Sequence, residues 1–172
     1  AGHPACGKGR VLVVAVLIAG ASASLSRAGQ PSPRQTDPAN MTVLRDIAYV
    51  PDGHGRQKLD LYLPKESSKD VKRPLIVWVH GGAWKAGSKE GCPAVRFVND
   101  GYAVASINYR LSQHAIFPAQ VQDCKAAIRW LRANADRHGI DPSRIGAWGP
   151  SAGGHLVALL GTAGDVNDFE VG

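Results

Sequence analysis

The sequence lacks the residue clusters that mark several common classes of protein. Its three cysteines do not have zinc-ligand spacing and its six histidines are scattered, so no metal site is expected. Outside the first 28 residues, 17 basic residues are mixed with 14 acidic ones, with no block of like charge. Nucleic acid is therefore not expected as a partner. No apolar run reaches the roughly 18–20 residues that a membrane-spanning helix needs.

The first 28 residues contain no acidic side chain. Lys8 and Arg10 precede the apolar run VLVVAVLIAGASA at 11–23, and small residues with the spacing of a cleavage site follow up to Ala28. This order is typical of a secretory signal. We therefore predict a signal peptide at 1–28 and an exported protein, periplasmic or secreted, with no stable membrane insertion after cleavage. An uncleaved anchor or a buried strand would be the alternatives.

Residues 29–42 carry three prolines among polar residues, which predicts an extended linker. We place the globular domain at 43–172. Its first two strands are expected at 43–50 and 59–63. The turn cluster PDGHG at 51–55 separates them, so the pair is predicted to form an antiparallel hairpin.

The rest of the domain alternates apolar strands with helices. Strands are expected at 74–80, 102–108 and 144–148, and helices at 89–100, 118–137 and 152–161. Unbroken apolar strands are typical of a sheet that is covered on both faces. The alternation predicts an α/β fold with a mostly parallel sheet, an N-terminal antiparallel hairpin and helices on both faces.

The segment GPSAG at 149–153 places Ser151 between two glycines where a buried strand turns directly into a helix. So tight a turn leaves no room for side chains at Gly149 and Gly153, and it exposes the serine hydroxyl. The N-terminus of the following helix points peptide N–H groups at the same place. These features are those of a nucleophile elbow. A glycine-rich packing turn would be the alternative.

A second motif, HGGAW at 80–84, directly follows the strand at 74–80. Two consecutive glycines allow backbone N–H groups to turn toward a ligand, and acyl transfer needs such donors for its oxyanion. A phosphate-binding loop would be the alternative, but Ser88 and Lys89 stand in the reverse of the order that such a loop requires. We expect His80 to brace the loop. Arg110 and Asp123 are expected to form a structural ion pair behind it.

Together, the motifs resemble those of the α/β-hydrolase superfamily, and within it the carboxylesterases related to hormone-sensitive lipase and the bacterial feruloyl-esterase-like group. The resemblance runs from about residue 46 to the C-terminus and rests on HGGAW at 80–84, NYRL at 108–111, FPA at 117–119 and GPSAGG at 149–154.

The resemblance implies a serine hydrolase of carboxylic esters, similar to carboxylesterases and lipases. Ser151 would be the nucleophile, and the N–H groups of Gly82, Ala83 and Ala152 would form the oxyanion hole. Trp84 would line the substrate pocket. Such enzymes use neither a metal nor an organic cofactor, and the substrate would be a small-molecule or polysaccharide-linked ester.

In this family the catalytic acid and the histidine base follow the nucleophile along the chain. Only 21 residues follow Ser151, and His155 lies one turn along the same helix. The resemblance therefore implies that the sequence is the N-terminal part of a hydrolase, truncated after the nucleophile helix and inactive alone. The edge of the strand at 144–148 would then be open. An arylformamidase, a serine exopeptidase or a non-catalytic binding domain of the same fold would be the alternatives.

Export would favour a disulfide between Cys92 and Cys124. In the fold that the sequence resembles, however, the helices that carry these residues cover opposite faces of the sheet. A disulfide requires Cα atoms within about 7 Å of each other. We therefore predict that the two thiols do not pair.

Overall fold

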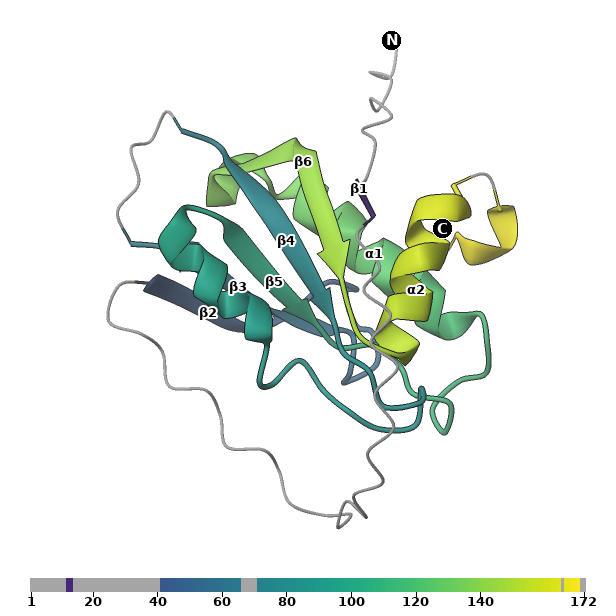
Figure 1. The fold of residues 1–172 in the computed structure, drawn as a ribbon. Coiled ribbons are helices and arrows are strands. Elements are labelled where there is room, and N and C mark those ends of the chain that lie inside the picture. The colour runs from purple at the N-terminus through teal and green to yellow at the C-terminus, as the bar shows by residue number, and fades with distance from the viewer. Residues whose placement is uncertain (1–11, 14–40, 66–70, 165, 171–172) are drawn as a thin grey trace, which may run out of the picture.

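The computed structural model describes residues 12–13, 41–65, 71–164 and 166–170. Six strands and several helices follow one another along these segments (Figure 1). The strands are β1 (Leu12–Val13), β2 (Met41–Ala48), β3 (Lys58–Pro64), β4 (Arg73–Val79), β5 (Ala103–Ile107) and β6 (Ile140–Trp148). The α-helices are α1 (Ala119–Ala133) and α2 (Ala152–Thr162), and the 3-10 helices are η1 (Pro93–Asp100), η2 (Asp136–His138) and η3 (Asn167–Phe169).

The strands form one sheet in the order β1-β6-β4-β5-β3-β2. Strand β4 pairs in parallel with both β5 and β6, whereas β3 pairs antiparallel with β5 and with β2. The predicted α/β class, with a parallel core and an N-terminal antiparallel hairpin, is therefore confirmed. Because β4, β5 and β6 are parallel, their carboxyl ends lie at one edge of the sheet, the lower edge in Figure 1.

The hairpin begins two residues earlier than the sequence predicts. The sequence places Met41 and Thr42 in the linker, but they form the start of β2 and are paired with Pro64 and Leu63 of β3. Met41 is buried among the side chains on one face of the sheet, which explains why the strand extends this far.

Helices cover both faces of the sheet, as predicted. Alternate residues of a strand point to opposite faces, so Leu75 and Val77 lie in the core beneath α1 and α2, whereas Trp78 lies beneath η1. Burial of such side chains stabilises the fold by about 1.5–3 kcal/mol each. This packing fixes the ends of β4 and β6 relative to each other.

Two predicted helices are shorter than expected. The helix expected at 89–100 is only η1, because Gly91 adopts a left-handed backbone (φ 68°) and Pro93, which has no N–H, stands at its start. The helix expected at 118–137 ends at Ala133, and the short η2 helix then leads to Gly139, which is left-handed (φ 63°).

The two described cysteines lie on opposite faces of the sheet, as predicted. Cys92 packs in the cluster beneath η1, and Cys124 packs in the cluster beneath α1 and α2. Both are buried free thiols.

The structure describes little of the predicted signal peptide and linker. Leu12 and Val13 form β1, which pairs in parallel with Gly146 and Ala147 of β6. The prediction of an open edge on β6 is therefore wrong over these two residues. The other residues of 1–28 lie outside the described part. Every helix in the described part of the chain falls short of a membrane-spanning segment in length or in apolar character.

Candidate active site

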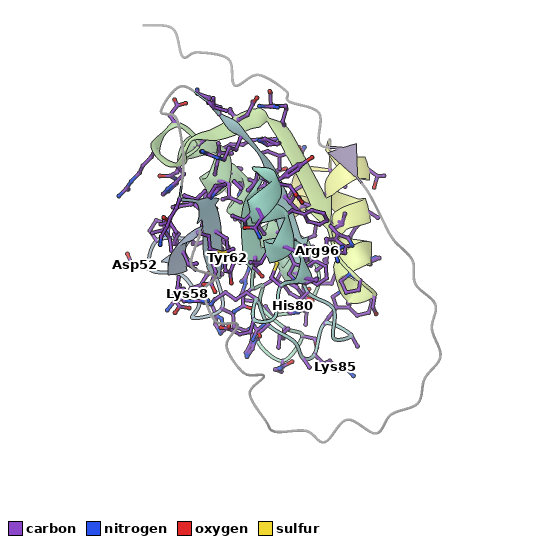
Figure 2. All side chains as sticks on the ribbon, turned by 60° about the vertical axis from the view of Figure 1, so that its left-hand side comes forward. Asp52, Lys58, Tyr62, His80, Lys85 and Arg96 are labelled. Carbon is purple, nitrogen blue, oxygen red and sulfur yellow. The ribbon has the colours of Figure 1, made fainter. Side chains whose placement is uncertain are left out.

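The two sequence motifs meet at one edge of the sheet. Strand β4 ends at Val79 and leads into the loop that begins with His80, while β6 ends at Trp148 and leads to Ser151. Figure 2 shows His80 at the lower end of the molecule, with Lys85 farther out on the same loop. A Cβ atom added to Gly81 would lie 3.0 Å from the Pro150 carbonyl oxygen and 3.6 Å from the Ser151 Cβ, so the loop and the serine turn are in contact.

Ser151 has the strained backbone of a nucleophile elbow. Its φ of 49° and ψ of −121° are rare for a residue with a side chain. The flanking glycines are needed because the end of β4 is so close: a Cβ on either Gly149 or Gly153 would overlap the Val79 carbonyl oxygen. Ser151 itself is exposed. Close contact between the turn and β4 therefore holds this hydroxyl at the surface.

Helix α2 begins immediately after the serine. The N–H groups of Gly153 and Gly154 bond to the Pro150 carbonyl, and that of His155 bonds to the Ser151 carbonyl at 3.0 Å. Within the described residues, the Ala152 N–H donates to no backbone carbonyl. It lies at the positive end of the helix, where negative charge is stabilised.

The loop after β4 adopts a left-handed backbone over three successive residues, with φ of 113° at Gly82, 52° at Ala83 and 58° at Trp84. The N–H groups of Lys85 and Ala86 both bond to the Gly82 carbonyl, which closes the loop on itself. In the part of the chain that the structure describes, the N–H groups of Gly82 and Ala83 have no backbone acceptor. The three N–H groups that the resemblance implies for an oxyanion hole therefore belong to this loop and to the first residue of α2, and none of them donates to a described backbone carbonyl.

Neighbouring segments hold the carbonyl groups of this loop. The Ser112 N–H bonds to the Trp84 carbonyl at 2.8 Å, and the Gln113 side chain donates to the Lys85 carbonyl. The Arg56 guanidinium donates to the Gly87 carbonyl at 2.8 Å. The loop is therefore fixed from two sides, by the β2–β3 turn and by the segment after β5.

His80 braces the loop, as predicted. Its side chain is 4% exposed and stacks on the Tyr109 ring, with 4.3 Å between ring centroids. Its Nδ1 is 2.7 Å from the Gly81 carbonyl oxygen, and its Nε2 is 3.2 Å from Nη2 of Arg56. Burial, together with the charge of Arg56, lowers the pKa of His80 to about 4 despite its bond to Gly81. The imidazole is thus neutral near pH 7.

Arg110 and Asp123 form the predicted ion pair. The Arg110 Nη2 is 2.8 Å from one Asp123 carboxylate oxygen, and its Nε is 2.9 Å from the other. The Arg110 backbone N–H and the Gln57 side chain also donate to this carboxylate, which is fully buried. Multiple donors satisfy a buried charge of this kind. The pair ties α1 to the segment after β5 and takes no part in the exposed site.

Sequence reasoning missed a second buried ion cluster, beneath the end of the loop. Lys89 is 3% exposed, and its Nζ lies 2.7 Å from Asp60 and 3.0 Å from Asp46. The Lys89 N–H bonds to the Asn108 side chain, and its carbonyl accepts from Ser106. The cluster anchors the loop to β3 and β5. Its signal in the sequence is Asp60, a charged residue between two leucines of β3.

Trp84 lies at the exposed surface beside the serine helix. It is 38% exposed, and its ring makes an edge contact with that of His155, at 5.4 Å between centroids. His155 is four residues after Ser151 on α2. Trp84 therefore links the loop to α2 and leaves part of its apolar surface open beside this helix.

Other features are distant from this edge. A hollow of about 420 Å³ lies at the opposite end of the sheet, lined by residues such as Arg73, Arg137 and His138. Within the described segments, no three His, Cys, Asp or Glu side chains come together as a metal site would require.

Comparison with known proteins identifies the family. The BD-FAE family model matches residues 59–172. The esterase LipC of Mycobacterium tuberculosis is 38% identical over 148 residues, which cover 78% of this chain and 36% of that protein.

Two solved structures are also similar. The structure of a truncated form of carbohydrate esterase from gut microbiota is 40% identical, with a TM-score of 0.68, over 76% of this chain and 47% of the other. Esterase B from Lactobacillus rhamnosis, inhibited by a tributyrin phosphonate, is 29% identical, with a TM-score of 0.66, over 74% of this chain and 41% of the other. The chain thus spans less than half the length of these three relatives. It belongs to the BD-FAE family of α/β-hydrolases.

Proposed function

We propose that the intact protein hydrolyses carboxylic esters through an acyl-enzyme on Ser151. The observation that carries this proposal is the junction of the strained, exposed Ser151 with a loop whose Gly82 and Ala83 N–H groups have no acceptor among the described backbone. The similarity to proteins named as esterases supports it.

In the proposed reaction, the Ser151 hydroxyl attacks the acyl carbon of the ester and the carbonyl oxygen becomes negatively charged. The N–H groups of Gly82, Ala83 and Ala152 stabilise that charge. The alcohol then leaves with a proton, and water hydrolyses the acyl-enzyme to release the acid and restore Ser151. Neither a metal nor an organic cofactor takes part.

A serine hydroxyl is a weak nucleophile until a base accepts its proton. His80 does not suit this role, because the Gly81 carbonyl and Arg56 occupy both of its ring nitrogens. We assign the base to a histidine, and its orienting group to an aspartate or glutamate, that lie outside these 172 residues. The length of the relatives supports this assignment.

The proposed substrate is an ester of a small molecule or of a polysaccharide. The exposed indole of Trp84, which contacts His155 one helical turn after Ser151, offers an apolar, aromatic surface to an acyl group or a sugar ring. The similarity to a carbohydrate esterase supports a sugar-linked ester.

Replacement of the nucleophile tests the proposal. In the intact protein, Ser151→Ala should lower turnover of a short-chain aryl ester by about 10⁴-fold or more, as expected when a catalytic triad loses its nucleophile. Ser143→Ala is the matched control, because Ser143 is an exposed serine in the first half of β6 whose hydroxyl donates to Asp141, whereas Ser151 follows the other end of that strand. A phosphonate inhibitor should label Ser151, as detected by peptide mass spectrometry. Full activity in Ser151→Ala, or a label on another residue, would refute the proposal.

A further inference from the structure

We propose that Arg56 is a positioning residue for the oxyanion hole, acting through His80 on the peptide that carries the Gly82 N–H. The inference rests on the proposed function, because it concerns how that N–H stabilises the oxyanion. Arg56 itself touches neither the substrate nor Ser151.

Arg56 lies in the turn between β2 and β3 and reaches the end of the neighbouring strands. Its Nε donates to the Tyr109 carbonyl at 2.9 Å, and its Nη2 donates to the Gly87 carbonyl at 2.8 Å. The same Nη2 lies 3.2 Å from Nε2 of His80. These partners are 24 to 53 positions away in the sequence. One half-buried guanidinium thus joins three separate segments.

These contacts determine the tautomer of His80. A guanidinium can only donate, so Nε2 of His80 accepts the hydrogen bond from Arg56. The Gly81 carbonyl can only accept, so Nδ1 of His80 carries the hydrogen and donates it at 2.7 Å. Only the neutral imidazole with its hydrogen on Nδ1 satisfies both contacts.

The imidazole has little freedom to rotate. It stacks almost parallel on the Tyr109 ring, with 11° between the planes, and the Tyr109 hydroxyl donates to the His80 carbonyl at 2.9 Å. Burial keeps the ring neutral by lowering its pKa. The hydrogen bond to the Gly81 carbonyl is therefore held in one geometry.

The Gly81 carbonyl and the Gly82 N–H belong to the same peptide group. Because that group is planar and trans, the direction of the carbonyl determines the direction of the N–H. A hydrogen bond to the carbonyl also polarises the amide, and hydrogen bonds in such a chain strengthen one another. The chain of hydrogen bonds from Arg56 through His80 to the Gly81 carbonyl therefore orients the Gly82 N–H and also makes it a stronger oxyanion donor.

The first test compares Arg56→Gln in the intact protein with the control Arg144→Gln. Arg144 is an exposed arginine in β6 that pairs with Asp141. Complete loss of an oxyanion donor costs about 10²–10³ in kcat, so loss of its support should lower kcat by about tenfold. KM should stay within about twofold, because the donor acts on the transition state. Arg56→Lys should recover part of kcat. Equal kcat values for Arg56→Gln and Arg144→Gln would overturn the proposal.

A double-mutant cycle separates this role from a purely structural one. In His80→Asn, the side-chain amide can still donate to the Gly81 carbonyl, but the series from Arg56 is broken. Adding Arg56→Gln to His80→Asn should then change kcat by less than about twofold, because coupled residues are not additive. If Arg56 merely held the loop through the Gly87 and Tyr109 carbonyls, the tenfold loss would appear in both backgrounds, and the proposal would be wrong.

The nitrogen NMR signals of His80 give a readout that does not need activity. At pH 7 the intact protein should show a neutral imidazole protonated on Nδ1, and the Nε2 signal should shift in Arg56→Lys. A wild-type His80 protonated on Nε2 would overturn the inference whatever the kinetics. Activity in Ser151→Ala would instead refute the proposed function alone. The NMR result on unmodified protein also remains decisive if Arg56→Gln does not fold.

Discussion

His80 links the chemistry of one residue to the stability of the whole fold. Its pKa falls from the ordinary value of 6.5 to about 4, mainly because burial disfavours the charged ring. Between these two pH values the unfolded chain takes up a proton that the folded chain does not bind. The stabilisation from a neutral His80 is therefore complete above pH 6.5 and is lost as the pH falls toward 4.

This residue should produce a measurable pH dependence. A pKa difference of this size corresponds to about 3 kcal/mol of unfolding free energy lost between pH 7.5 and 4. Urea unfolding of the intact protein at several pH values measures it. His80→Asn, which does not titrate there, should show a smaller loss over the same interval, and the difference between the two proteins isolates the imidazole from the carboxylates. Identical pH profiles would contradict the prediction.

At the scale of the elements, the site depends on the start of α2 lying against the end of β4. Gly153→Ala should destabilise the fold, because the new Cβ would overlap the Val79 carbonyl oxygen and lie 2.7 Å from that of His80. These are backbone atoms, so they cannot move aside cheaply, and a cost of about 1–3 kcal/mol or more is expected. Gly164→Ala is the control, since no atom of the described residues beyond its chain neighbours lies within 4 Å of its Cβ position. Equal midpoints of denaturant unfolding for the two variants would show that α2 can shift away from β4.

The elements that the sequence predicted well are those with a strong local pattern. Residues 74–79 are apolar throughout and form most of β4, and residues 103–107, which form β5, are apolar except for Ser106. The turn cluster between β2 and β3 predicted the hairpin that these two strands form. The start of β6 at Ile140 was missed because Asp141, Pro142 and Ser143 interrupt the apolar pattern. Its pairing with β4 depends on a shift of register after Arg73 that only the packed sheet shows.

The candidate site likewise has one part that the sequence reveals and another that only the folded structure shows. The glycine pattern around Ser151 and the motif after β4 reveal the turns, because each turn requires glycine locally. The residues that hold the loop in place, Arg56 and Lys89, have no such pattern around them. Arg56 lies in an ordinary polar turn, and Lys89 stands where the sequence predicts the first turn of an exposed helix. Their partners, Gly87 and Tyr109 for Arg56 and Asp60 for Lys89, become neighbours only when β3 pairs with β5. Contacts that tertiary pairing creates are therefore beyond what sequence periodicity can predict.

For the whole molecule, the sheet separates two cores that have different contents. The core beneath α1 and α2 is larger and contains Cys124, while the smaller core beneath η1 contains Cys92 together with Trp78 and Trp148. Strand β4 contributes side chains to both cores, because Leu75 and Val77 point into one and Trp78 into the other. Loss of that strand would therefore expose both cores. The reactivity of each thiol therefore reports whether the core on its own face of the sheet is exposed.

Thiol labelling of the intact protein tests whether these faces open together. Burial raises the pKa of Cys92 to about 11 and raises that of Cys124 further, so at pH 8 both remain neutral thiols, which react poorly. Neither should react with a thiol reagent in the native state, and both should react in denaturant, as peptide mass spectrometry can follow for each residue. At intermediate denaturant the two rates should agree, because exposure of either thiol requires loss of the shared sheet. Faster reaction at Cys92 would show instead that η1 detaches from the sheet while the core beneath α1 and α2, and with it the support of Ser151, stays folded.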